Sequence, residues 1–205
     1  MIQRLSALLL PIILAACAGG EEIYAPIDDV ASRAYVHGGP STLTLYTVIS
    51  NASNKGAHTS LMINGPQRVI WDPAGSFKNS GTPERGDVLF GMTPQMLDVY
   101  IDYHARKRYR VVEQVLPVSP EVAAMALQIV QSEGPQGNAT CSLSTSRILA
   151  RLPGFQGFPV SYFPKKTRAA FAAKGASQRV IYDDDDDQND ALIGFPGRHA
   201  LGARG

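Results

Sequence analysis

The chain has 205 residues, of which 44% are hydrophobic and 18% are charged, and its formal net charge is +1. This composition supports a hydrophobic core and excludes a disordered chain, while the small charge leaves no strong field to attract nucleic acid. The two cysteines exclude a disulfide-rich scaffold and a Cys-based zinc finger, and the four histidines show no HxH or HExxH spacing. We therefore expect one domain with no metal, no cofactor and no nucleic-acid partner.

The amino terminus has the features of a signal peptide. Arg4 precedes an apolar run of 12 residues, Leu5 to Ala16, which is too short for the roughly 20 residues of a membrane-spanning helix. The run ends in Leu14-Ala15-Ala16-Cys17, which resembles the lipobox of bacterial lipoproteins. That resemblance implies removal of residues 1–16 and lipidation of Cys17. A plain signal peptide cut near Ala16 and a buried apolar helix remain the alternatives.

Composition divides the rest of the chain into three parts. Residues 17–40 are rich in Gly and Pro without a sustained period, so we expect a lipidated tether. Residues 41–182 carry the periodic segments of a folded domain. Residues 183–205 begin with a run of aspartates and are expected to be a disordered acidic tail. No Asp stands directly after Cys17. By resemblance to the sorting rule of enteric bacteria, this favours the outer membrane, on its periplasmic side.

The first half of the domain reads as strands. Residues 41–50 are rich in Thr, Val, Ile and Tyr, which predicts a strand. Two short apolar runs, 57–63 and 68–72, flank Asn64-Gly65-Pro66 and predict a hairpin. The Pro-, Gly- and Ser-rich residues 73–87 are expected to form a loop.

The second half mixes helices with strands. N-cap residues, prolines and apolar residues at helical spacing predict four helices: from Thr93 to about Arg106, from Ser119, from about Cys141, and over 164–174. Strands are expected over 108–116 and 179–182. The fold class is therefore α+β, an antiparallel sheet with helices packed on it.

Cys141 is the one free thiol once Cys17 is lipidated. It follows a polar loop, Gly137 to Thr140, and opens a predicted helix. Backbone N–H groups and the helix dipole at that position favour a thiolate and can stabilise an oxyanion. A small buried hydrophobic residue is the alternative reading of a lone cysteine.

A cysteine nucleophile needs a base, and His58 is the best candidate by elimination. It lies at the start of a predicted strand, whereas His199 is in the tail and His37 in the tether. The cations at 106–108 disfavour protonation of His104. A purely structural role for His58 remains an alternative.

Asp72 is the candidate that orients the imidazole. If residues 64–66 form a three-residue loop, counting back along both strands pairs His58 with Asp72. A two-residue turn instead places Trp71 or Pro73 there. A turn role before Pro73 is the competing interpretation of Asp72.

The order of these residues resembles the circularly permuted NlpC/p60 branch of papain-like thiol enzymes. The resemblance rests on Gly56-Ala57-His58-Thr59-Ser60-Leu61, on Asn138-Ala139-Thr140-Cys141-Ser142-Leu143 and on Leu152-Pro153-Gly154-Phe155, and it covers about residues 42–160. It implies a papain-like fold and a cysteine amidase, peptidase or acyltransferase, in which Cys141 attacks a carbonyl and His58 transfers the proton.

The expected substrate is an amide or ester of a peptidoglycan peptide or a lipid. Two other functions remain open: a non-catalytic envelope lipoprotein that binds peptidoglycan, lipid or a partner protein on a degenerate papain-like fold, and an envelope assembly factor tethered through the tail.

Overall fold

The computed structural model describes residues 24–182, which form a seven-stranded antiparallel sheet with helices on both faces. The strands are β1 (Thr42–Ser50), β2 (Gly56–Asn64), β3 (Arg68–Trp71), β4 (Glu84–Arg85), β5 (Val88–Leu89), β6 (Tyr109–Pro117) and β7 (Ser177–Ile181), in the spatial order β4-β5-β3-β2-β1-β6-β7. The helices are α1 (Ile27–Ser32), α2 (Pro94–His104), α3 (Pro120–Glu133), α4 (Cys141–Ala150) and α5 (Pro164–Ala172). The α+β class expected from the sequence is confirmed.

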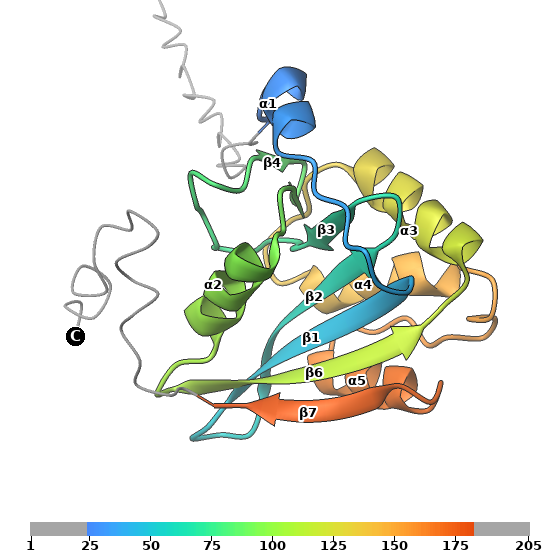
Figure 1. The fold of residues 1–205 in the computed structure, drawn as a ribbon. Coiled ribbons are helices and arrows are strands. Elements are labelled where there is room, and N and C mark those ends of the chain that lie inside the picture. The colour runs from blue at the N-terminus through green and yellow to red at the C-terminus, as the bar shows by residue number, and fades with distance from the viewer. Residues whose placement is uncertain (1–23, 183–205) are drawn as a thin grey trace, which may run out of the picture.

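Two hydrophobic cores lie on opposite faces of the sheet. Helices α3, α4 and α5 cover one face, where Leu45, Leu61 and Trp71 are buried. Helix α2 covers the other face through Val99 and Tyr100 (Figure 1). Because both faces are covered, β1 is buried along nearly its whole length and lacks the alternation of a half-exposed strand.

Local signals in the sequence placed most elements correctly. Thr93 Oγ1 and Ser119 Oγ accept hydrogen bonds from the backbone N–H groups of Met96 and Val122, as N-caps of α2 and α3. The hairpin of β2 and β3 forms where it was expected. The short strands β4 and β5 were not predicted, because two-residue strands carry no readable alternation.

The segment 24–40 differs from the free tether that its composition suggested. It contains α1, Tyr24 forms an isolated bridge with Arg85, and the backbone N–H of Arg68 donates to Tyr35 O at 2.7 Å. Val30 packs against the larger core. This part of the predicted tether is therefore fastened to the domain by long-range contacts that composition does not reveal.

Several predictions lie outside the described residues: the signal peptide over 1–16, the lipidation of Cys17 and the tail over 183–205. Within 24–182, none of the helices has both the length and the apolar character that crossing a bilayer requires.

Candidate active site

The candidate site lies at the part of β2 that no longer pairs with β3. The ladder between β2 and β3 ends at Leu61–Trp71, and the chain then turns away, with the Asp72 N–H donating to Asp87 O at 2.8 Å. The edge of β2 at His58 and Thr59 therefore has no strand beside it there. Helix α4 packs on β2, and its first residue lies near this edge. That residue is Cys141.

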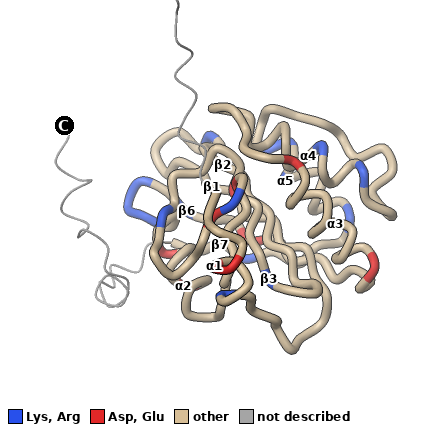
Figure 2. Tube along the Cα trace, turned by 90° about the horizontal axis from the view of Figure 1, so that it is seen from above, with Lys and Arg blue, Asp and Glu red and all other residues tan. Residues whose placement is uncertain are grey.

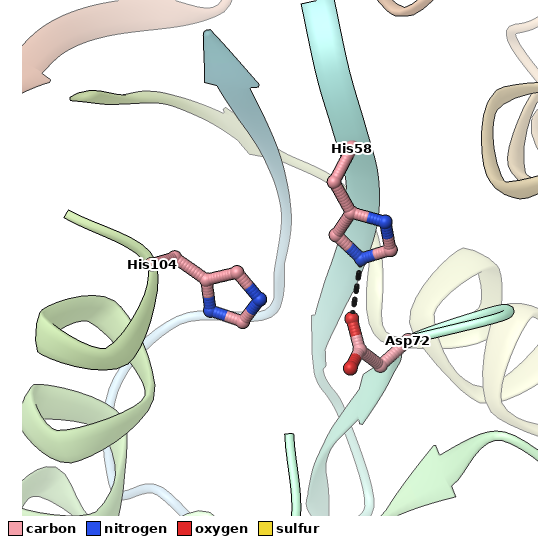
Figure 3. Close-up of side chains that lie close together, drawn as sticks. All are labelled: His58, Asp72 and His104. Atoms are coloured by element: carbon pink, nitrogen blue, oxygen red, sulfur yellow. Dashed lines mark hydrogen bonds and ion pairs between the residues drawn. The ribbon is translucent and has the colours of Figure 1, made fainter. Parts of the chain in front are cut away.

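His58 and Asp72 are joined by a hydrogen bond. His58 Nε2 lies 2.7 Å from Asp72 Oδ1 (Figure 3), and Asp72 is buried. Tyr100 Oη lies 2.7 Å from both Asp72 Oδ1 and Ser60 Oγ. Since an ionised carboxylate only accepts, Tyr100 donates its one proton to Asp72 and accepts from Ser60. Asp72 therefore receives two donors on one oxygen.

The Cys141 thiol meets the other side of the same imidazole. It lies near the His58 side chain and the backbone N–H groups of Thr59 and Ser142, which all act to lower its pKa. Because Asp72 occupies Nε2, the nitrogen left for the thiol is Nδ1. Thr140, the N-cap of α4, makes no side-chain cap, so the backbone N–H groups of the first helical turn are not taken up by it. The helix end is thus open to the sulfur and to an oxyanion beside it.

These contacts shift three pKa values toward the charged forms. Burial alone would raise the pKa of Cys141, but the His58 imidazole and two backbone donors lower it below its usual value. Burial would lower the pKa of His58, but Asp72 and the thiolate outweigh burial and raise it to about 10. Burial would raise the pKa of Asp72, but His58 and then Tyr100 lower it to about 2. These shifts favour the thiolate of Cys141, the imidazolium of His58 and the carboxylate of Asp72.

His104, at the end of α2, is a neighbour that sequence reasoning set aside. Its ring stacks on that of His58 with centroids 5.7 Å apart and an angle of 7° (Figure 3). Its Nδ1 donates to Tyr100 O at 2.8 Å. Burial, then the charges of His58 and Arg106, outweigh Asp72 and lower the pKa of His104 to about 4. It is therefore a neutral ring against a charged one. The signal in the sequence was its spacing of four from the buried Tyr100.

Asp87 was also missed, because it lies in a segment that reads as a loop. Its Oδ2 accepts from the backbone N–H of Ala74 at 3.2 Å and of Gln136 at 2.7 Å. One carboxylate thus ties the loop after Asp72 to the loop before Cys141. Burial raises the pKa of Asp87 above its usual value, against the lowering effect of these two hydrogen bonds.

His58, Asp72 and His104 also offer three potential metal-ligand atoms within 4.8 Å of one another. Two atoms bound at about 2.1 Å to one tetrahedral ion lie about 3.4 Å apart. The 2.7 Å between His58 and Asp72 is instead a hydrogen-bond distance, and Asp72 Oδ1 already accepts from Tyr100. We interpret the group as a hydrogen-bonded pair, His58 and Asp72, with the His104 ring stacked on His58.

The three residues singled out from the sequence as catalytic, Cys141, His58 and Asp72, thus lie together. The register that led to Asp72 was wrong, however: Asn64 pairs with Arg68, so the loop is 65–67 rather than 64–66. The chain was compared with models of protein families, with curated proteins and with solved structures, and none of them matches it.

Proposed function

We propose that this protein is a thiol hydrolase or acyltransferase of the cell envelope that acts on an amide or ester bond through Cys141, His58 and Asp72. The observation that supports it best is the imidazole of His58, held between a buried carboxylate and a thiol at the start of α4. A nucleophile, a base and a group that orients the base are the parts of a covalent acyl-transfer site. We further propose that the domain is a papain-like fold of the permuted NlpC/p60 branch.

The chemistry follows from the charges of these residues. The Cys141 thiolate attacks the substrate carbonyl carbon, and the oxygen gains negative charge beside the N–H groups at the start of α4. The tetrahedral intermediate collapses, the bond to the leaving nitrogen or oxygen breaks, and His58 Nδ1–H gives that atom its proton. A thioester on Cys141 remains.

Water or another acceptor then releases the acyl group. His58, now neutral, takes a proton from the acceptor, whose oxygen attacks the thioester carbonyl. The carbon–sulfur bond breaks and the thiolate returns beside the imidazolium. Asp72 keeps Nε2 protonated throughout, so that Nδ1 is the nitrogen that exchanges the proton.

We place this chemistry at a membrane. A lipid on Cys17 would hold the domain on the periplasmic side, with the outer membrane favoured, where peptidoglycan peptides and lipids are both within reach. One acyl chain binds only marginally, and two or three chains give a stable anchor.

An activity-based thiol probe tests the proposal. In a Cys17→Ser background Cys141 is the one cysteine of the chain, so labelling reports on this site alone. We expect strong labelling at pH 6 that Cys141→Ser abolishes and His58→Ala lowers about tenfold or more, since one pKa unit changes the thiolate fraction tenfold. His37→Ala, which changes a histidine outside the candidate active site, is the matched control.

Slow labelling in the wild type, indifferent to His58→Ala, would contradict an enzyme. It would favour a non-catalytic lipoprotein that binds peptidoglycan, lipid or a partner on the same fold.

A further inference from the structure

Three cations gather beside the site without a carboxylate among them. They are Arg110 on β6 and Lys165 and Arg168 on α5, and we call them the basic cluster. Arg110 donates to the side-chain oxygens of Asn51 at 3.1 Å and of Asn54 at 2.5 Å. Lys165 Nζ donates to the backbone oxygen of Asn54 at 3.2 Å. One neutral asparagine therefore holds two of the cations.

The positive charge of the basic cluster is not neutralised within the described chain. None of the ion pairs among residues 24–182 involves Arg110, Lys165 or Arg168. Burial and then the charge of Arg110 lower the pKa of Arg168, so the two guanidinium groups are close enough to repel each other. Arg110 and Arg168 are half-buried and Lys165 is exposed. Like charges held together without an ion pair cost free energy that an anion would offset.

Two contacts connect the basic cluster with the nucleophile. Ser142, which follows Cys141, has its Oγ 2.8 Å from Thr167 Oγ1, and Thr167 lies between the cluster's two α5 residues. Pro164, the first residue of α5, packs so closely on Gly56 that a Cβ there would be 2.7 Å from Pro164 Cβ. Gly56 is two strand residues, or about 7 Å, before His58. These two contacts bring α5, which carries two of the three cations, against the segments that contain Cys141 and His58.

We propose that the basic cluster is a subsite that binds a carboxylate of the acyl substrate on which Cys141 acts. This inference rests on the proposed function. Guanidinium groups match the planar geometry of a carboxylate, and a lysine adds a point charge. The substrate class is accordingly an acyl compound that also carries an acidic group.

The place of the cluster favours a substrate over lipid headgroups. The described chain begins at Tyr24, beside β4, whereas the β1–β2 turn that contacts the cluster lies at the other end of the sheet (Figure 1). Six residues lie between Cys17 and Tyr24. The seven Cα–Cα steps reach at most about 25 Å. In a domain anchored at Cys17, the end of the sheet with the basic cluster is therefore the one farther from the point of attachment. The segment leading into β6 adds further basic residues at 106–108 (Figure 2).

A pair of alkylating reagents tests the proposal, because iodoacetate carries a carboxylate and iodoacetamide is its neutral analogue. In the Cys17→Ser background we expect Lys165→Gln and Arg168→Gln each to lower the ratio of the iodoacetate rate to the iodoacetamide rate about twofold to threefold at low salt. The effect should shrink at high salt, where the Debye length shortens.

Lys174→Gln is the matched control. Lys174 also donates to a backbone oxygen, that of Gly154 at 2.8 Å, and follows the far end of α5. Equal ratios in all variants would overturn the subsite but leave the proposed function standing. Slow reaction of the wild type with iodoacetamide would instead overturn the proposed function.

Vesicles distinguish the other source of an anion. The Cys17→Ser protein should sediment equally little with phosphatidylcholine vesicles whether or not they contain phosphatidylglycerol. Sedimentation with phosphatidylglycerol that the double variant Lys165→Gln/Arg168→Gln abolishes would assign the cluster to lipid headgroups and overturn the substrate subsite.

Discussion

His58 Nε2 and Asp72 Oδ1 lie 2.7 Å apart although the two residues are not opposite each other in the sheet. Extending the β2–β3 ladder beyond Leu61–Trp71 by one pair places Ser60 opposite Asp72. His58 and Asp72 therefore meet diagonally, on one face of the sheet, and Tyr100 joins Asp72 to Ser60. The diagonal places the imidazole beyond the end of β3, where α4 brings the thiol.

Asp72→Asn should leave the fold intact and lower the reactivity of Cys141. An amide still fits the space, but it withdraws the charge that raises the pKa of His58, and it can hold the wrong imidazole tautomer. We expect alkylation at pH 6 to slow about tenfold, with an unchanged circular dichroism spectrum. Asp98→Asn, an exposed position on α2, is the isosteric control. An undiminished alkylation rate in Asp72→Asn would mean that another group orients the imidazole of His58.

Gly75→Ala should displace the carboxylate of Asp72. A Cβ at Gly75 would lie 1.9 Å from Asp72 Oδ2 and 2.8 Å from Asp72 O, so the side chain of Asp72 must move. We expect a slower alkylation of Cys141, comparable to that of Asp72→Asn, and a loss of about 1–3 kcal/mol in the free energy of unfolding. Gly137→Ala, where a Cβ meets nothing within 4 Å, should change neither measurement.

The prediction of Asp72 shows why a contact can be correct when its register is not. The error in the loop shifted the pairing by two residues, and a shift by two keeps every side chain on its face. The predicted loop therefore still placed Asp72 on the face of His58. A shift by one would have brought Trp71 or Pro73 there and lost the contact.

Other parts of the site depend on long-range packing that one sequence does not encode locally. Tyr100 and His104 lie on the buried face of α2, and their spacing predicts a shared face but not what that face covers. Asp87 has a left-handed backbone, φ 58°, in a segment that reads as a turn. Its two backbone partners, 13 and 49 residues away along the chain, come together only in the folded domain.

Cys17→Ser should release the protein from the membrane. The apolar run that ends at Cys17 predicts a lipid anchor, and a serine cannot carry the thioether-linked lipid. We expect unprocessed or soluble protein after membrane fractionation, with Cys141→Ser retained on membranes as the control. Full retention of the Cys17→Ser protein would contradict the anchor.

The alkylation rate of Cys141 should be high well below the pH at which an ordinary thiol reacts. A free thiol titrates near pH 8.5, whereas the pKa of Cys141 is lowered by His58 and by the backbone N–H groups around it. The thiolate should persist with the imidazolium up to about pH 10, where His58 loses its proton. We therefore expect the rate with iodoacetamide to reach its plateau at a lower pH than that of a free thiol.

His58→Ala should remove most of the difference in alkylation rate between Cys141 and a free thiol. The smaller effect of the helix end should remain. The rate of the variant should rise with pH toward that of a free thiol. A flat, slow profile in the wild type is the result expected of a structural cysteine.

His104→Phe should make the protein more resistant to mild acid. A histidine in the unfolded chain titrates near pH 6.5, and in the folded protein burial and the neighbouring His58 charge lower the pKa of His104 to about 4. The unfolded chain therefore binds this proton more readily. The stability that a neutral His104 provides is complete above pH 6.5 and is lost as the pH falls toward 4. Phenylalanine does not titrate, and its ring can keep the contacts with Tyr100 and Tyr103.

The measurement is the free energy of unfolding by urea at pH 7.5 and pH 4.5, for the wild type and for His104→Phe. The wild type should lose up to about 3 kcal/mol more than the variant between the two pH values. His58 does not account for this difference, because its pKa is raised: its contribution is complete below pH 6.5 and declines as the pH rises toward 10. An equal loss in both proteins would show that His104 is not held neutral beside His58.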